Sequence, residues 1–422
     1  MKNPFKNSLL KSVTILLSGS VIAQLLSILC SPIMTRLYTE EQIGEYTLLL
    51  TAISMFGTVL CGRYDQSIVS ESNERRVYAL VKLCLILSVV TSLAIGVGYT
   101  AYFVYNGETT LPWWEVFLWI TVLLVLTGVG YAISAYNNRF KQYKLMASVH
   151  VVRTVGKEVS MIGLGALKTG ARGLLVSQVL SVGLGLNRQA RDLKQNAQKL
   201  RSVTAADIKE AAKVHIRQPL FSVPASFANN YSYSVLNLFI NELYGAATLA
   251  HYSMSFRILG LPLGLISVNV SKAFFEKASR EYDETGKCRK TFLQTSGMLL
   301  VVAIPMVALL MLLAPWAFEW FFGEGWGQAG VYVQCLAPLF GLRLVVGTLA
   351  PTMIICGKQA VELILQGSFF LCAYVARFLC GGRSTEEFLI CVAALYAVVY
   401  VVFYLIMLKA SNSTKKEKKQ DG

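Results

Sequence analysis

The chain has 422 residues, of which 55% are hydrophobic and only 15% charged, with a formal net charge of +15. Apolar runs of about twenty residues recur from end to end, and a run of that length crosses the hydrocarbon of a bilayer as one helix. This pattern is typical of an all-α polytopic membrane protein and argues against a β-barrel, whose strands would read as shorter segments of alternating polarity.

The hydropathy pattern predicts about twelve membrane-spanning helices. We interpret the first as a retained span rather than a signal peptide, because it is long, contains Gln24 and lacks a small-residue cleavage site. The predicted spans, in chain order, are 12–35, 44–62, 79–104, 113–136, 146–166, 171–187, 218–241, 247–270, 292–313, 329–355, 359–380 and 387–408.

Basic residues predict the orientation of these spans. If the N-terminus is cytoplasmic, 29 of the 39 Lys and Arg residues fall in cytoplasmic segments and four in the opposite loops. An excess of Lys and Arg marks the cytoplasmic side of membrane proteins. The sequence therefore predicts two cytoplasmic termini, a basic tail containing KKEKK at 415–419, and inner loops that face anionic lipids. The positive charge needs no nucleic acid to explain it.

Two halves of six spans are separated by a long polar stretch after span six, which reads as a cytoplasmic helical linker near the membrane surface. LYTEEQIGEY at 37–46 and LYGAATLAHY at 243–252 match at a constant offset of 206, each at the turn between the first two spans of its half. This predicts two six-helix bundles related by a parallel pseudo-repeat around a central cavity, as in transporters. The predicted divisions are an N-terminal bundle at 1–190, a basic linker at 191–217, a C-terminal bundle at 218–409 and a tail at 410–422.

Six basic side chains fall inside predicted spans; Lys82 and Arg377 lie near span ends, and the other four are Arg153, Lys157, Arg257 and Arg343. Arg257 is about ten residues from the outer end of its span, or roughly 15 Å deep. Each such charge costs about 2.5 to 3.5 kcal/mol on insertion scales, so a compensating partner or a hydrated cavity is expected. Arg153 and Lys157 share a helix face because they are four residues apart. We interpret them as the lining for an anionic substrate; for Arg257, a buried hydrogen bond to a helix C-terminus is the structural alternative.

Other polar residues also have a structural interpretation. Span seven carries Asn229, Asn230 and Tyr233, which could bind sugars through hydrogen bonds and ring faces, or bond to neighbouring helices. Arg63 and Asp65 at the inner end of span two could form a local interfacial ion pair.

No enzyme signature is present in the sequence. The three histidines, His150, His215 and His251, lack metal-ligand spacing, and neither a phosphate loop nor a GxSxG elbow occurs. The sequence thus predicts no catalytic residue, no metal site and no cofactor.

Several stretches resemble a bacterial polysaccharide (O-antigen or capsule repeat-unit) flippase of the Wzx type, within the multidrug/oligosaccharidyl-lipid/polysaccharide exporter superfamily. They are SPIMTRLYTEEQIGEYTLLLTAIS at 31–54, GRYDQSIV at 62–69, QPLFSVPASFANN at 218–230, and HYSMSFRILGLPLGLI at 251–266 followed by SKAFF at 271–275. One departure is Asp65, where the resemblance leads us to expect Glu. The carboxylate is kept.

The resemblance implies transport of an oligosaccharide on undecaprenyl diphosphate from the inner to the outer leaflet of the bacterial cytoplasmic (inner) membrane. It implies a diphosphate contact at Arg257 and an inner gate at Arg63 and Asp65, and it suggests a polysaccharide polymerase and other assembly proteins as partners. Coupling to a sodium or proton gradient is plausible for the superfamily, with Glu158 as the candidate ion or proton site. Arg153, Lys157 and Arg343 rest on the charge argument alone.

Two other functions compete. A multidrug exporter would share the fold, but its cationic drugs would favour acidic cavity residues, whereas the deep charges here are mainly basic. An integral-membrane polymerase would need a substantial outer loop or an acidic catalytic site, and the largest outer loop predicted is at about 314–328.

Overall fold

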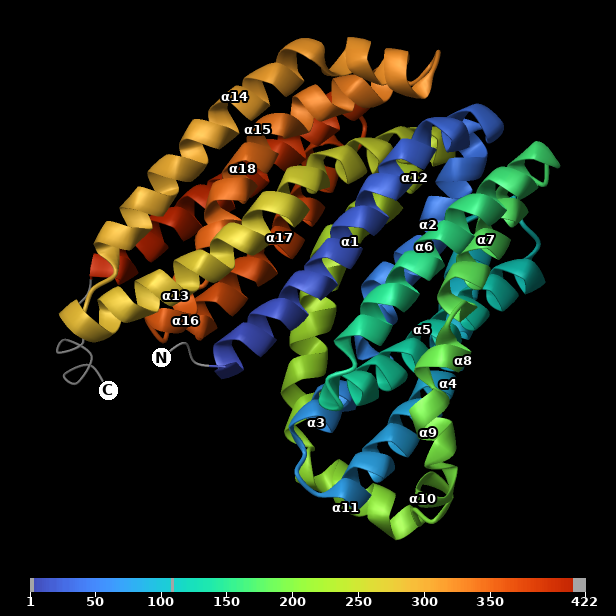
Figure 1. Ribbon diagram of the computed structural model, residues 1–422. Coiled ribbons are helices and arrows are strands. Elements are labelled where there is room, and N and C mark those ends of the chain that lie inside the picture. Colours follow the sequence, from blue (N-terminus) through green and yellow to red (C-terminus); the bar gives the residue numbers. More distant parts are fainter. Residues whose placement is uncertain (1–3, 108–109, 413–422) are drawn as a thin grey trace. The chain divides into compact units, whose positions relative to one another are not determined.

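The computed structural model describes residues 4–107 and 110–412, and this part of the chain is helical throughout, without β-strands (Figure 1). The predicted basic tail at 415–419 lies outside the described residues. The chain forms two compact units, 1–234 and 235–422. The boundary between the two units lies within one long helix.

The first unit contains the helices of the first six predicted spans and the linker. Its long helices are α1 (Pro4–Leu37), α2 (Glu40–Phe56), α4 (Glu74–Asn106), α5 (Trp113–Arg139), α6 (Tyr143–Ala166) and α7 (Ala171–Gly183). The shorter ones are the 3₁₀ turn η1 (Gly57–Val59), α3 (Tyr64–Ser70), α8 (Leu186–Gln189), α9 (Arg191–Gln195), α10 (Ala197–Arg201), α11 (Ala205–Val214) and the π-helix η2 (Gln218–Ser222).

Close helix contacts order this unit: α1 packs on α6, α4 on α5, and α6 on α7 (Figure 1). The Tyr38 hydroxyl donates a 2.7 Å hydrogen bond to the Met161 carbonyl, and a Cβ at Gly165 would lie 2.8 Å from the Tyr38 ring. Such close backbone approach is usual where membrane helices pack through small residues.

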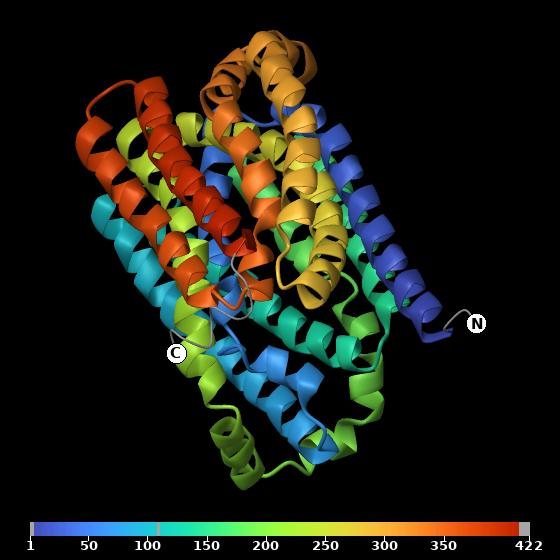
Figure 2. The same ribbon diagram turned by 90° about the vertical axis from the view of Figure 1, so that its left-hand side faces the viewer.

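The second unit begins within α12 (Val223–Pro262). It continues through the π-helix η3 (Leu263–Ser267), α13 (Val268–Thr285), α14 (Arg289–Phe322), α15 (Gly327–Leu349), α16 (Thr352–Ile355), α17 (Gln359–Cys380) and α18 (Thr385–Asn412). Within it, α15 packs against both α14 and α18, and α17 against α18 (Figure 2). Because α14 continues to Phe322, it takes up most of the outer loop predicted at 314–328, carrying Trp316 and Trp320 as helix residues.

Each of the twelve predicted ranges falls mostly on helices. By length and apolar composition, six helices of the described residues qualify as spans, or seven if the pair Glu40–Val59 and Tyr64–Ser70 is one bent span. One of the six, Gln218–Thr285, has 68 residues and is interrupted at Gly245, so it contains two of the predicted spans. The chain is therefore a multi-pass membrane protein, and the number twelve stays a prediction.

The predicted internal repeat coincides with a shared break in the helices. Thr39 is the extended N-cap of α2, with φ −74° and ψ 162°, and its side chain forms a capping box with Gln42. At the offset of 206 lies Gly245, the residue that interrupts α12 with φ 85° and ψ 174°. A positive φ of this kind suits glycine, which lacks the Cβ that would clash. At these equivalent positions, Thr39 begins a helix through its side-chain cap, whereas Gly245 interrupts a helix through its backbone angles.

Span two is less regular than predicted. Instead of one helix over 44–62, α2 and η1 are followed by a break, and α3 leaves at 45°. Gly62 and Arg63 both have left-handed backbone angles, φ 59° and φ 60°, which turn the chain at this point. The predicted loop at 63–78 therefore begins with a short helix.

Candidate functional site

Arg153 on α6 is bonded to the end of the neighbouring helix α7. Its Nε donates a 2.9 Å hydrogen bond to the Leu184 carbonyl, and its Nη2 donates to Gln189 Oε1 at 3.4 Å. The Arg153 carbonyl in turn accepts from the Ser181 hydroxyl at 3.1 Å. A guanidinium beside the last carbonyls of a helix is stabilised by the helix dipole. The arrangement considered for Arg257, a bond to a helix C-terminus, is thus seen at Arg153.

Lys157 and Glu158 lie one turn further along α6 and have different surroundings. The Lys157 Nζ is 5.7 Å from the ring centroid of Tyr46, whose hydroxyl donates to Gln178 Oε1 at 2.9 Å. Glu158 is 3% exposed and accepts a 2.7 Å hydrogen bond from the Ser27 hydroxyl of α1. The carboxylate is thereby buried between α1 and α6, while the ammonium group is next to an aromatic face that leaves its charge unneutralised.

The Arg63–Asp65 motif lies at the break before α3. Both side chains are partly buried, and within the described part of the chain Arg63 Nε, Asp65 Oδ1 and Ser67 Oγ are buried without a hydrogen-bond partner. A non-glycine residue at positive φ, such as Arg63, is uncommon and costs about 1–2 kcal/mol. Strained backbone and unsatisfied buried polar atoms both tend to occur where a protein changes conformation or binds a ligand.

The polar start of α12 contacts the end of the second predicted span. Asn230 Nδ2 donates a 2.7 Å hydrogen bond to Thr58 Oγ1, and Phe227 stacks on Phe56 with 5.4 Å between ring centroids. Asn229 and Tyr233 are partly buried on the same helix. Asn230 thus has the helix-bridging contact that was the alternative to sugar binding.

In the second unit, Arg343 of α15 lies against two phenyl rings. Its guanidinium carbon is 5.5 Å from the centroid of Phe340 and 5.8 Å from that of Phe256, and these rings meet edge to face at 5.2 Å. Arg257 follows Phe256 directly on α12 and is partly buried. The aromatic pair therefore connects the helices that carry the two deep arginines of this unit.

Two ion pairs were not predicted from the sequence. Arg172 donates to both carboxylate oxygens of Glu115, at 2.7 and 2.8 Å, and Glu115 is only 6% exposed. Arg377 similarly bonds to both oxygens of Glu242 at 2.5 Å. The members of each pair are far apart in sequence, so no local spacing indicated them.

A family model described as "Polysaccharide biosynthesis protein" matches residues 33–330, more than half of the chain. The chain belongs to this family. A curated relative, the teichuronic acid biosynthesis protein TuaB of Bacillus subtilis (strain 168), is 23% identical over 186 residues, which are 44% of this chain and 38% of TuaB. The match thus spans well under half of that relative's length.

Solved structures show which fold this polysaccharide biosynthesis protein has. The lipid II flippase MurJ in an inward closed conformation matches with a TM-score of 0.70 at 12% identity, covering 94% of this chain and 90% of that one. An inward-facing multidrug resistance MATE transporter of the MOP superfamily gives 0.65 at 17% identity, covering 92% and 96%. A MOP superfamily transporter from Pyrococcus furiosus gives 0.61 at 16%, covering 96% and 95%. The fold is therefore the two-lobed fold of MOP-superfamily transporters, as predicted.

The linker of this family member is packed on the first unit. Its helices α10 and α11 lie against the beginning of α4 in both views (Figures 1 and 2). Apolar side chains of the linker, among them Val203 between the two helices and Ala211 on α11, are buried in a cluster with Tyr64 and Val77. The apolar face expected near the membrane surface is thus covered by protein.

Charged residues surround this linker contact. Ion pairs connect Arg75 with Asp207 at 2.9 Å, Arg76 with Glu210 at 2.8 Å, and Lys199 with Glu74 at 2.7 Å. The His215 Nε2 lies 2.8 Å from a Glu71 carboxylate oxygen, at hydrogen-bond distance.

Hydrogen bonds lower the pKa values of two carboxyls in this contact. The backbone N–H of Asn73, and then His215, lower the pKa of Glu71. The Thr204 N–H and the Arg75 guanidinium lower the pKa of Asp207 to about 2.

Proposed function

We propose that this protein is a flippase that moves undecaprenyl-diphosphate-linked oligosaccharide repeat units, of O-antigen or another surface polysaccharide, from the cytoplasmic to the periplasmic leaflet by alternating access. The observation that carries the proposal is the combination of a polysaccharide biosynthesis family with the fold that the lipid II flippase MurJ shares. MurJ is described as a flippase of lipid II, and we propose a lipid-linked cargo for this chain. The proposed location is the bacterial cytoplasmic (inner) membrane, with both termini cytoplasmic.

The basic residues fit an anionic cargo. A diphosphate cannot cross hydrocarbon unaided, and a guanidinium binds phosphate oxygens through two parallel N–H donors. We propose that Arg257 and Arg343 contact the diphosphate. Two phenyl rings lie beside Arg343, one of them directly before Arg257 on α12, and they attract its positive charge. Lys157, beside Tyr46, is the corresponding candidate in the first unit, and Arg153 would act next to it.

The remaining predicted residues have proposed roles of their own. Asn229, Asn230 and Tyr233 would contact sugars of the cargo, with Asn230 exchanging its bond to Thr58 when cargo binds. The strained turn at Arg63 and the buried unpaired Asp65 oxygen support a gate at α3. The buried Glu158 carboxylate is the proposed site for a coupled proton or sodium ion. A polysaccharide polymerase and other assembly proteins would receive the cargo outside.

The experiment that tests this function is deletion of the gene in its host, followed by analysis of surface polysaccharide and of lipid-linked repeat units by leaflet. Flipping predicts loss of surface glycan with repeat units accumulating at the cytoplasmic leaflet. Unpolymerised units already exposed outside would instead indicate a polymerase.

The likeness to a MATE transporter favours a second candidate, a multidrug exporter. It makes a distinct prediction in the same deletion strain: unchanged glycan together with altered drug tolerance. The basic character of Arg257, Arg343 and Lys157 argues against it, because cationic drugs need acidic partners.

A further inference from the structure

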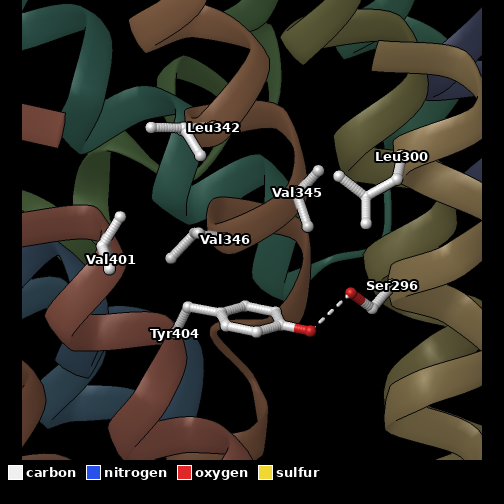
Figure 3. Close-up of a pocket in the computed structure, with 7 residues that line it drawn as sticks. All are labelled: Ser296, Leu300, Leu342, Val345, Val346, Val401 and Tyr404. Carbon is white, nitrogen blue, oxygen red and sulfur yellow. Dashed lines mark hydrogen bonds between the residues drawn. The ribbon is translucent and has the colours of Figure 1, made fainter. Parts of the chain in front are cut away.

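An apolar groove runs between three helices of the second unit (Figure 3). Its floor is α15, which contributes Leu342, Val345 and Val346. The walls are α14 and α18, which pack closely on α15 but make little contact with each other. The volume of the groove is about 170 Å³.

A pair of hydroxyl groups lies at one end of the groove. At one end the Tyr404 hydroxyl of α18 and the Ser296 hydroxyl of α14 share a 2.9 Å hydrogen bond, which Figure 3 shows bridging the two walls. The other lining side chains are aliphatic, including Leu300 and Val401 on the walls. The hydroxyl pair lies toward the start of α14 and the end of α18, so the aliphatic part lies deeper along both helices.

The walls of the groove are apolar on their outer side as well. Leu300 is 41% exposed and Val401 46% exposed, and further exposed aliphatic side chains follow on the same helices, Ile304 on α14 and Val398 on α18. A face of this kind on a multi-pass protein meets lipid chains rather than water. Because lipid surrounds such a face, a groove that opens in it is accessible to the acyl chain of a lipid.

Basic residues lie beyond the polar end of the groove on both walls. Lys290 is in the first turn of α14, six residues before Ser296, and Lys409 is in the last turn of α18, five residues after Tyr404. These spacings correspond to roughly 9 and 7.5 Å along the helices. Both lysines are exposed. Glu281 caps α14 by accepting from the Lys290 and Thr291 backbone N–H groups, so the Lys290 ammonium extends from an already capped helix end.

We propose that this groove binds one anionic phospholipid of the cytoplasmic leaflet, with an acyl chain between α14 and α18 and the phosphate at Lys290 and Lys409. The order of groups matches such a lipid: cations first, then the hydroxyl pair at the depth of the glycerol and ester groups, then aliphatic side chains. Basic sites between helices at the cytoplasmic surface attract anionic headgroups. This site is independent of the proposed cargo and of the arginines assigned to it.

The test measures binding of phosphatidylglycerol and phosphatidylcholine to the purified full-length protein by native mass spectrometry, alongside thermal unfolding in detergent with each lipid. Val401→Trp would occupy the groove from its exposed wall. Its matched control is Val398→Trp, one turn away on α18 and 61% exposed but not part of the lining. Leu300→Trp occupies the groove from the opposite wall, so the test does not depend on one variant.

We expect Val401→Trp and Leu300→Trp each to weaken phosphatidylglycerol binding about tenfold, the value for losing burial of two methylene groups, and Val398→Trp to bind like the unaltered protein. The double variant Lys290→Gln, Lys409→Gln should lose the preference for phosphatidylglycerol over phosphatidylcholine. Unchanged binding in both groove variants would overturn the proposal. Displacement of phosphatidylglycerol by an equal concentration of undecaprenyl phosphate would overturn it too, because the groove would then take the carrier lipid.

Discussion

Arg153 in the first unit and Arg343 in the second are both deep cations, but their surroundings differ. Arg153 donates to the Leu184 carbonyl at the end of α7 and to the Gln189 side chain on α8, whereas Arg343 lies over the rings of Phe256 and Phe340. Oxygen acceptors use the N–H donors of a guanidinium, while ring faces attract only its charge. The comparison teaches that burial and charge alone do not identify a substrate contact. The groups that surround each guanidinium have to be known as well.

The largest effect is expected from removing the deep arginines of the second unit. Arg257→Ala and Arg343→Ala should each abolish surface glycan while the amount of protein in the membrane stays normal, because the diphosphate loses its cation. Glycan analysis and immunoblotting of the same cells measure both quantities. Normal glycan in either variant would refute the role of that residue.

A lysine substitution sharpens this prediction. If bidentate recognition matters, Arg257→Lys should restore only part of the glycan, because an ammonium group cannot present the planar pair of donors. Full activity would show that charge alone is sufficient.

A smaller and different effect is expected at Arg153. Arg153→Gln should lower the free energy of unfolding by about 1–3 kcal/mol, since a hydrogen bond from a charged group to the Leu184 carbonyl is lost. Thermal unfolding of the purified protein should show a lower Tm, and glycan lost beyond the loss of protein measures the proposed cargo contact of Arg153. An unchanged Tm would break the comparison with Arg343.

A substitution in the turn before α3 should lower the free energy of unfolding by about 1 kcal/mol. Gly62→Ala puts a Cβ on a residue with φ 59°, where it would also lie 3.2 Å from the Tyr64 ring, and left-handed backbone costs other residues about 1–2 kcal/mol. Gly98→Ala in α4 is the control, because its Cβ would meet no atom within 4 Å and alanine favours helix. We expect a lower Tm for the first variant and an equal or higher Tm for the second.

The smallest effect concerns pH at the linker. The pKa values of Glu71 and Asp207 are lowered in the folded protein, so these carboxylates stabilise it above their ordinary pKa near 4, and the contribution is lost as the pH falls toward 2. At neutral pH, Asp207→Asn should therefore have a slightly lower Tm than the unaltered protein. The difference should shrink on acidification below about pH 5; a constant difference would contradict the assignment.

Much of the fold could be predicted because each long helix has its own apolar run. The equivalence of Thr39 and Gly245 could also be predicted, because the repeat is a match of two short sequences at a fixed offset. The bend at Gly62 and Arg63 was not predicted, because hydropathy does not report backbone angles.

The candidate site was predicted as a set of residues but not as a set of contacts. Arg153 and Leu184 are 31 residues apart, and Glu115 and Arg172 are 57 apart. Such pairs depend on which helices pack against each other. A single sequence does not reveal that packing. The roles of Arg257, Arg343, Lys157 and Glu158 therefore stay predictions, now with defined neighbours for the last three.

The stretch from 218 to 285 can also be considered as a mechanical element. Pro219 lies within η2, and Pro262 directly precedes η3. A proline removes one N–H donor and crowds the carbonyl four residues earlier, and a wider π turn relieves that crowding. The regular α-helical segments are thereby joined at irregular positions, at 218–222, at Gly245 and at 263–267. Curvature at the two π turns can change by exchanging one carbonyl acceptor for its neighbour, so that the number of hydrogen bonds is conserved while the direction of the helix changes.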